Sequence, residues 1–336
     1  MLTVAIPTYG RNETLLQTLP ALLPQLTNEC RLLILDNCSP MPVADTLRNL
    51  LAVWPSVNCR IFRHRCNLGA TANILRCFEL SETEWIWTLG DDDIVSPNAI
   101  SSILYCIYEN QDADYISFLT TPGEKAGRRA TTTKAQGVSN FIRAIDDVGG
   151  INFMSCSVWK VASFEAGLRY GYDYAYSMGW AFALLLNNLG DKGQVVFSHF
   201  AIINAPTLAP IASRWSYRKF LLGWATLLEI PNNRKDLDIL AKKMLGIHPP
   251  EVIAAYLLAD AASCAWPKGL LYYDLVAGRV LPYNTHVLGR VRLFLYRFLF
   301  IKPRLGWWLV RNLIALANRI GYKSVEINDM EKRSSE

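Results

Sequence analysis

The feature that most constrains the fold is an alternation, over the first 120 residues, of short apolar runs with longer stretches of helical periodicity. The apolar runs are rich in β-branched and aromatic residues, which favour strands. They cover residues 2–7, 31–36, 58–64, 85–89 and 115–119. Helical patterns cover residues 12–26, 43–53, 69–80 and 97–110. Strands that alternate with helices predict an α/β fold with a mostly parallel sheet flanked by helices.

Two of these helices have start signals. Asn12 is a good N-cap in front of a leucine-rich helical pattern. Ser96 and Pro97 predict the N-cap and the first helical position of the fourth helix. Both helices are expected to begin shortly after a strand-end loop.

Polar or conformationally special residues follow four of the predicted strands. They are Pro7-Thr8-Tyr9-Gly10, Asp36-Asn37-Cys38-Ser39, Arg65-Cys66-Asn67-Leu68-Gly69 and Gly90-Asp91-Asp92-Asp93. In open α/β sheets, ligands bind beyond the carboxyl ends of the strands. The four loops are therefore expected to meet at one binding edge.

The loop Asp91-Asp92-Asp93 places three carboxylates directly after an apolar run. Adjacent carboxylates repel one another unless a cation is present, and hard divalent cations prefer oxygen ligands. In an extended segment alternate residues point the same way, so Asp91 and Asp93 would face one ligand and Asp92 another direction. Mg²⁺ or Mn²⁺ keeps positions open for substrate phosphates, so the loop predicts a metal and diphosphate site. The alternative is a solvated acidic turn before the helix at Pro97.

Four segments, in this order, resemble the motifs of the inverting family 2 glycosyltransferases, which have the GT-A fold. They are AIPTYGRNETL, LLILDNCSP, NLGATANI and LGDDDIVSPNAI. The resemblance is strong over residues 1–120, loose over 150–205 and gives no guidance beyond. Gly10 departs from the family, which often has asparagine there. The resemblance implies a nucleotide-sugar-binding half at residues 1–120 and an acceptor-binding half at 121–209.

The resemblance also implies roles for residues in these loops. The nucleobase would be held by Pro7, Thr8, Tyr9 and Asp36. The rest of the nucleotide would be contacted by Asn67, Gly69, Asn73, Asp91 and Asp92. The ligands of Mn²⁺ or Mg²⁺ would be Asp91 and Asp93. For Asp36, an Asx turn with Ser39 is the alternative.

Inverting sugar transfer needs a general base that takes the proton of the acceptor hydroxyl. In the family this carboxylate lies near the start of a helix in the second half, which favours Asp173 in RYGYDYAYSMGW. Asp146 and Asp147 are competitors, and a helix cap is the alternative role of Asp173. Some members of the fold use a histidine after a late strand as a metal ligand, which here would be His199, otherwise a packed or surface side chain.

The second half has less regular patterns. Residues 120–137 are polar and basic and predict a loop. Residues 152–160 and 194–203 resemble strands, and residues 175–189 a buried helix. From about residue 210 the pattern is helical, which predicts a helical carboxyl-terminal region over 210–336.

Residues 275–325 contain nine lysines and arginines, no acidic residue and many large aromatic side chains. This mixture is typical of a helix in a membrane interface and predicts peripheral membrane contact. A helical appendage with a solvated basic face is the alternative. Nucleic acid is not expected as a partner, although an RNA surface would use similar residues.

The amino-acid composition excludes or disfavours several classes of protein. The 336 residues are 51% hydrophobic, which excludes a chain disordered throughout, and the net charge of +5 does not argue for nucleic acid. Eight cysteines form no CxxC pair and fit a reducing compartment. Neither a signal peptide nor a membrane span is visible in the sequence.

These observations together predict a metal-dependent hexosyl- or deoxyhexosyltransferase. It would move a sugar from a nucleotide-diphospho-sugar to a hydroxyl of a lipid-linked glycan during synthesis of a bacterial surface polysaccharide such as O antigen. It would work in the cytoplasm, at the inner face of the cell membrane. A sugar-nucleotide nucleotidyltransferase is the alternative enzyme, although only Gly10 and Arg11 represent its basic glycine-rich loop. A non-catalytic membrane- or RNA-binding protein is the other alternative; no G-x-G-x-x-G supports an oxidoreductase.

Overall fold

The computed structural model describes most of the first two thirds of the chain and parts of the last third. The described residues are 1–121, 129–145, 148–177, 179–204, 223, 225–231, 233–245, 255, 257–259, 261–262, 274, 294 and 296–319. The chain forms two compact units. Unit 1 comprises residues 1–175 and 180–209, and unit 2 comprises residues 176–179 and 210–336.

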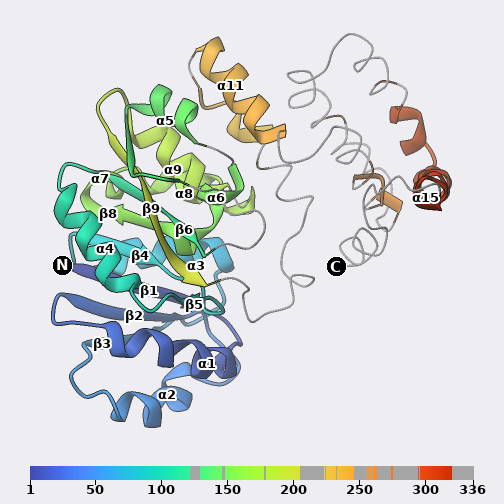
Figure 1. The fold of residues 1–336 in the computed structure, drawn as a ribbon. Helices are drawn as coiled ribbons and strands as arrows, with labels where there is room; N and C mark the ends of the chain where they lie inside the picture. The colour runs from blue at the N-terminus through green and yellow to red at the C-terminus, as the bar shows by residue number, and fades with distance from the viewer. Residues whose placement is uncertain are drawn as a thin grey trace. The chain divides into compact units, whose positions relative to one another are not determined.

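The first four strands in spatial order are parallel and occupy one side of the sheet in unit 1 (Figure 1). They are β3 (Cys59–Arg63), β2 (Cys30–Asp36), β1 (Leu2–Thr8) and β4 (Trp85–Thr88). The register pairs Thr8 of β1 with Asp36 of β2, so the carboxyl ends of these two strands lie level. All four match runs predicted from the sequence.

The second half of the sheet is mixed. The strand β8 (Ser157–Lys160) runs antiparallel between β4 and β6 (Tyr115–Thr120). The strand β9 (Gln194–Asn204) is parallel to β6, whereas β5 (Ile94–Val95) and β7 (Thr133–Gln136) pair antiparallel with β9. The predicted α/β class is confirmed, with parallel pairing concentrated in the first four strands.

Helices flank the sheet on both faces (Figure 1). In the first half they are α1 (Asn12–Leu22), α2 (Val43–Ala52), α3 (Ala70–Leu80) and α4 (Ala99–Glu109), with the 3-10 turn η1 (Leu23–Gln25). In the second half they are α5 (Val138–Ala144), α6 (Val148–Asn152), α7 (Val161–Glu165), α8 (Leu168–Asp173) and α9 (Trp180–Asn188), with the 3-10 turns η2 (Met154–Cys156) and η3 (Ala175–Ser177).

Both predicted N-caps are wrong. Arg11 is the N-cap of α1, while Asn12 is already helical and its side chain donates to Thr46 at 2.7 Å. The helix α4 begins at Ala99 with Asn98 as its N-cap. The Ser96 hydroxyl instead bonds the Asn204 side chain at 3.1 Å, because residue 96 pairs with β9.

Three predicted boundaries in the second half also change. The predicted loop 120–137 contains β7, whose β-branched start pairs with the free edge of β9. The predicted strand 152–160 is a strand only from Ser157, because η2 precedes it. The predicted helix 175–189 is helical from Trp180.

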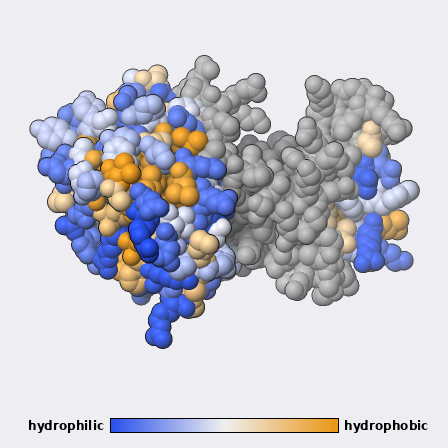
Figure 2. Space-filling model, turned by 90° about the horizontal axis from the view of Figure 1, so that it is seen from below, coloured by the Kyte–Doolittle hydropathy of each residue, from blue (hydrophilic) through white to orange (hydrophobic). Residues whose placement is uncertain are grey.

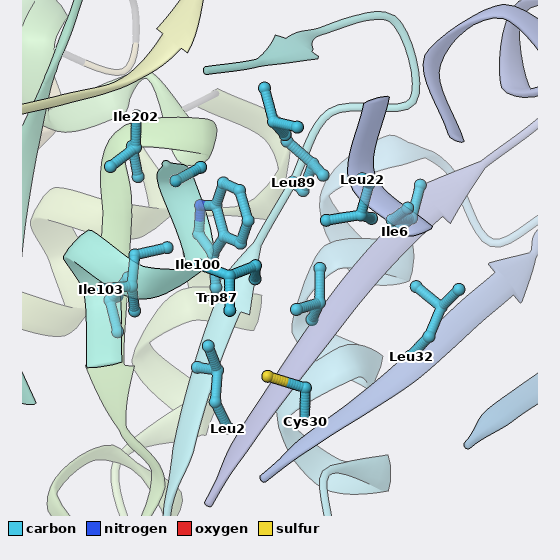
Figure 3. Packing of buried hydrophobic residues seen from close by; sticks show 14 of the residues in the cluster. Leu2, Ile6, Leu22, Cys30, Leu32, Trp87, Leu89, Ile100, Ile103 and Ile202 are labelled. Carbon is cyan, nitrogen blue, oxygen red and sulfur yellow. The ribbon is translucent and has the colours of Figure 1, made fainter. Parts of the chain in front are cut away.

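The main hydrophobic core lies between the sheet and the helices α1 and α4 (Figure 3). Strands β1, β2, β4 and β9 contribute Leu2, Leu32, Trp87 and Ile202, each no more than 1% exposed. The opposite face of the sheet is covered by α3, α7 and α9. There Trp159 of β8 packs against Phe78, Phe164, Tyr115 and Trp180. With both faces of the sheet covered, a ligand site is expected beyond the carboxyl ends of the parallel strands.

The described elements of unit 2 are helical. They include α11 (Arg234–Leu245), the 3-10 turn η6 (Arg297–Phe300) and α15 (Pro303–Arg319). Within the described ranges, no helix combines the length and the hydropathy that crossing a membrane requires.

Candidate active site at the carboxyl edge of the sheet

The acidic loop lies beside the carboxyl end of β1, because β4 is the parallel neighbour of β1. The Thr8 hydroxyl donates to Asp91 Oδ2 at 2.7 Å. Arg11, at the start of α1, donates to Asp91 Oδ1 at 2.6 Å and to Asp92 Oδ2 at 3.2 Å. The guanidinium group of Arg11 thus offsets part of the negative charge of the loop. The structure brings together the first and fourth loops predicted from the sequence.

Asp93 has a different environment from its neighbours. It is 3% exposed, its Oδ2 accepts a hydrogen bond from Ser155 at 2.5 Å, and its Oδ1 has no hydrogen-bond partner. Burial raises the pKa of Asp93, the Ser155 hydrogen bond lowers it in part, and the nearby charge of Asp91 raises it again, so that the net change is upward. A buried carboxylate oxygen without a partner is costly, so Asp93 Oδ1 is an acceptor that a cation or a hydrogen-bond donor would satisfy.

The donor set fits a hard divalent cation that a substrate helps to hold. Among the described residues, no group of three or more His, Cys, Asp and Glu side chains is placed to bind a metal ion by itself. Mg²⁺ and Mn²⁺ sites in enzymes that act on phosphates commonly use one or two carboxylates plus phosphate oxygens and water. Asp93 supplies one carboxylate with an oxygen that has no partner, and Asp91 supplies a second whose oxygens each accept one hydrogen bond and so each keep a lone pair.

Asp36 lies level with Thr8 but has all its oxygens occupied within the protein. Its Oδ1 accepts from the Ser39 backbone at 2.7 Å, and its Oδ2 accepts from Arg63 at 2.5 Å and from the Val43 backbone at 3.2 Å. Burial alone would raise the pKa of Asp36, but these hydrogen bonds outweigh it and hold the pKa below its ordinary value. The Asx-type turn with Ser39 is present, and Asp36 fixes the loop that leads into α2.

The third loop is tied to the second by Asn37. The Asn37 side chain donates to Asn67 at 2.9 Å and accepts from the Leu68 backbone at 2.9 Å. Asn67 and Gly69 are exposed at the rim, and Gly69 has a φ of +84° just before α3 begins. Asn73 is different: it is 2% exposed and bonds His64 at 3.0 Å, so its side chain lies inside the protein.

Two residues of the first loop differ in exposure. The Tyr9 side chain is 47% exposed at the rim, whereas Pro7 is half-buried within β1. The Thr8 side chain is buried against Asp91. Of these three, Tyr9 offers the largest accessible surface for stacking with a nucleobase.

The predicted general base lies at the end of α8, where the Asp173 side chain is exposed. Its tyrosine neighbours have partners elsewhere: Tyr172 donates to Glu79, and Tyr170 packs under the guanidinium group of Arg169. The competing residues 146 and 147 lie outside the described residues.

His199 is not brought to the acidic loop. Its Nδ1 bonds the Thr132 hydroxyl at 2.8 Å, and its ring packs on Phe200. β9 meets the segment after the acidic loop at Asn204, which pairs with Ile94. The five residue steps of extended chain from His199 to Asn204 span roughly 16 Å, too far for one metal ion to bind both His199 and Asp93.

Sequence reasoning missed three residues that shape the site. Arg11 directly follows the first loop. Because the first and fourth loops were expected to meet, this arginine could have been predicted to pair with the acidic triplet. Arg63 ends β3 and had no local signal for its contact with Asp36. Ser155 is 62 residues from Asp93 along the chain and is brought to it only by the antiparallel strand β8.

A further unsatisfied group lies next to η2. Asn152, at the end of α6, is 6% exposed, and neither its side-chain nitrogen nor its oxygen has a hydrogen-bond partner. Buried amides without partners are uncommon in folded proteins. Asn152 is therefore another buried side chain, besides Asp93, with polar atoms that no described group satisfies.

Comparison with known proteins gives consistent results. Residues 3–166 match the family model Glycosyl transferase family 2. A Haemophilus influenzae protein named as an uncharacterized glycosyltransferase is 25% identical over 116 residues. That alignment spans 34% of this chain and only 37% of the relative's length.

Solved structures share the fold at low sequence identity. S. aureus TarS 1-349 in complex with UDP-GlcNAc has a TM-score of 0.60 at 13% identity, over 97% of this chain and 94% of that chain. The mannosyltransferase PcManGT from Pyrobaculum calidifontis, in complex with GDP-Man and Mn²⁺, has a TM-score of 0.52 at 13% identity, over 89% and 86%. These similarities confirm the predicted GT-A-like fold.

Proposed function

We propose, from the match of residues 3–166 to the family model Glycosyl transferase family 2, that the protein is a metal-dependent, inverting glycosyltransferase. The observation that carries the proposal is the acidic loop, in which the buried Asp93 keeps one carboxylate oxygen without a partner. A solvated acidic turn would not bury this carboxylate. A site completed by a cation and a diphosphate would.

The donor in this proposal is a nucleotide-diphospho-sugar. Supporting observations are the UDP-GlcNAc and GDP-Man bound to the structural relatives. In this chain Tyr9, Asn67 and Gly69 are exposed, and they follow strands β1 and β3 of the same parallel set as the acidic loop. Tyr9 would stack on the base, and the left-handed Gly69 would let backbone approach the nucleotide. Asp36 would hold the conformation of the second loop and would not bind the base, because its oxygens already accept hydrogen bonds from Ser39 and Arg63.

Asp93, together with Asp91, would hold Mn²⁺ or Mg²⁺. When bound, such an ion neutralises charge that builds up on a departing diphosphate. Thr8 and Arg11 hold the Asp91 carboxylate from two sides, which fixes its orientation. Arg11 also adds a positive charge beside Asp91 and Asp92.

Asp173 would be the general base. Its exposed carboxylate is available to a hydroxyl group from solvent, and a carboxylate within hydrogen-bond reach of an attacking oxygen removes its proton as the new bond forms. The proton ends on Asp173, the acceptor oxygen bonds the anomeric carbon, and the nucleoside diphosphate leaves from the opposite face.

The acceptor would be a lipid-linked glycan at the cytoplasmic face of the membrane, as in the synthesis of a bacterial surface polysaccharide. α15 supports this part of the proposal. Four apolar side chains on this helix are between 41% and 64% exposed: Leu305, Trp308, Leu309 and Leu313. The last three lie three, four and eight residues after Leu305, so all four share one face of the helix. Figure 2 shows hydrophobic and hydrophilic residues side by side on the visible described surface of this region, at the right of the picture. Such a helix suits an interface with anionic lipid.

The experiment that tests the function is a thermal-shift screen of UDP-, GDP-, CDP- and dTDP-sugars with and without Mn²⁺. We expect one nucleotide class to raise the melting temperature in the presence of Mn²⁺, because a ligand that binds only the folded state stabilises it. Asp93→Ala should abolish the metal-dependent part of that shift.

Two results would overturn the proposal. One is a lack of any shift with every donor. The other is a shift that Asp93→Ala leaves unchanged. Release of pyrophosphate from a nucleoside triphosphate and a sugar phosphate would instead identify a nucleotidyltransferase.

A further inference from the structure

Ser155 contacts both ends, Gly90 and Asp93, of the acidic turn formed by residues 90–93. It lies in η2, is fully buried, and is separated from the turn by more than sixty residues of sequence. Its hydroxyl accepts from the Gly90 backbone N–H at 2.8 Å and donates to Asp93 Oδ2 at 2.5 Å. A hydroxyl has one proton, and because the Gly90 N–H occupies a lone pair, that proton is directed to Asp93.

The turn is closely packed around Gly90. A Cβ atom on Gly90 would lie 2.6 Å from Asp93 Oδ2 and 3.2 Å from Ser155 Oγ. The Asp93 backbone N–H also returns to the Gly90 carbonyl at 3.3 Å. The carboxylate of Asp93 is therefore held between Ser155 and the backbone of Gly90.

η2 is itself fixed to β4. The indole nitrogen of Trp87 donates to the Ser155 carbonyl at 2.8 Å, and the Thr88 hydroxyl donates to the Met154 carbonyl at 3.0 Å. Both donors come from the strand that leads into the acidic turn. Ser155 is thus attached to the same rigid element as the carboxylate that it contacts.

We propose that Ser155 is the positioning residue of the metal-binding carboxylate, holding Asp93 Oδ2 so that Oδ1 is left for the cation. This inference rests on the proposed function and adds a residue from the acceptor half to the donor site. Hydrogen bonds that orient a ligating carboxylate commonly change metal affinity by about tenfold to a hundredfold.

The structure offers a matched control two residues away. Ser157 is also fully buried, and its hydroxyl bonds the Tyr115 hydroxyl at 2.8 Å rather than the acidic turn. Ser155→Ala and Ser157→Ala each remove one buried hydroxyl, and both should lower the stability, Ser155→Ala by more because its hydroxyl makes two hydrogen bonds. Only Ser155→Ala should change metal binding.

The test measures Mn²⁺ binding to the full chain by electron paramagnetic resonance of free Mn²⁺, with UDP, GDP, CDP or dTDP added in separate titrations. We expect Ser155→Ala to weaken Mn²⁺ binding about tenfold or more, Ser157→Ala to leave it unchanged, and Ser155→Thr, which keeps the hydroxyl, to recover part of it. Circular dichroism confirms that each variant is folded.

Two outcomes would overturn the inference while leaving the proposed function standing: Mn²⁺ affinity unchanged in Ser155→Ala, or weakened equally in both alanine variants. If the wild-type chain binds no Mn²⁺ with any of the four nucleotides, the proposed function fails first and the inference fails with it. The wild-type titration separates these cases.

Discussion

Asp36 and Asp93 lie at the same edge of the sheet, but their carboxylates are in opposite situations. Asp36 accepts three hydrogen bonds, one of them from a guanidinium group, and its pKa is lowered. Asp93 accepts one, beside the negative charge of Asp91, and its pKa is raised. The first carboxylate stabilises the folded chain when ionised. The second destabilises it when ionised, which is typical of a site kept for a ligand.

This contrast predicts opposite effects of the same substitution on the metal-free protein. A raised pKa means that the contribution of Asp93 to stability is present below the ordinary aspartate value of 3.8 and is lost as pH rises through its folded pKa. Asp93→Asn should therefore gain in melting temperature relative to wild type as pH rises from acid to neutral.

Asp36→Asn should show the reverse. The stability from ionised Asp36 is present above 3.8 and is lost only as pH falls through its lowered folded pKa, so this variant should be less stable than wild type at neutral pH. Thermal unfolding in EDTA across this pH range checks both variants. A loss of stability in Asp93→Asn at neutral pH, equal to that in Asp36→Asn, would contradict the assignment.

Among the elements, backbone conformation as well as apolar patterning decides where helices begin and end. Gly137 precedes α5 with a φ of +77°, and a Cβ there would lie 2.7 Å from the Asp191 carbonyl oxygen. Gly190 has a φ of +51°, and no atom lies within 4 Å of the Cβ position. Both glycines are in the left-handed region, but only one is also in close contact with backbone.

Alanine substitutions at Gly137 and Gly190 distinguish the cost of a left-handed backbone conformation from the cost of a steric clash with neighbouring backbone. Gly190→Ala should lower the free energy of unfolding by about 1 kcal/mol, the usual penalty for a side chain in the left-handed region. Gly137→Ala should cost about 2–3 kcal/mol, because the backbone of residue 191 must also move. Urea titrations of both variants measure the difference, and equal losses would show that the collision is relieved without cost.

At the scale of the whole molecule, the two units have different chemistry at their surfaces. Unit 1 carries the acidic turn at the edge of its sheet, whereas the described end of unit 2 carries exposed apolar side chains among basic ones. One of the basic residues, Arg297, forms a two-pronged ion pair with Asp274 at 2.8 and 3.0 Å. The exposed Lys302 and Arg304 lie beside the apolar side chains of α15.

The proposed membrane contact predicts that the full chain binds vesicles containing phosphatidylglycerol more tightly than vesicles of phosphatidylcholine alone. Replacing both Leu305 and Trp308 by serine should weaken this binding by about tenfold or more, since apolar area no longer enters the interface. Tyr108→Ser is the matched control, because Tyr108 is a 73% exposed aromatic on α4. Vesicle sedimentation gives the comparison, and equal binding by all three proteins would remove α15 as the contact.

The α/β class, the first four strands and the loop that carries the carboxylates could all be predicted from the amino-acid sequence. These features follow from local apolar periodicity and from residues adjacent in the chain, such as Asp91 and Asp93. Tertiary structure decided which oxygens of those carboxylates remain available. The partners of Asp93 and Asp36 are Ser155 and Arg63, which are distant in sequence and reach the site only through strand pairing. His199 is a further example. A histidine can bind a metal ion, but strand pairing places this one beside Thr132 and away from the acidic loop.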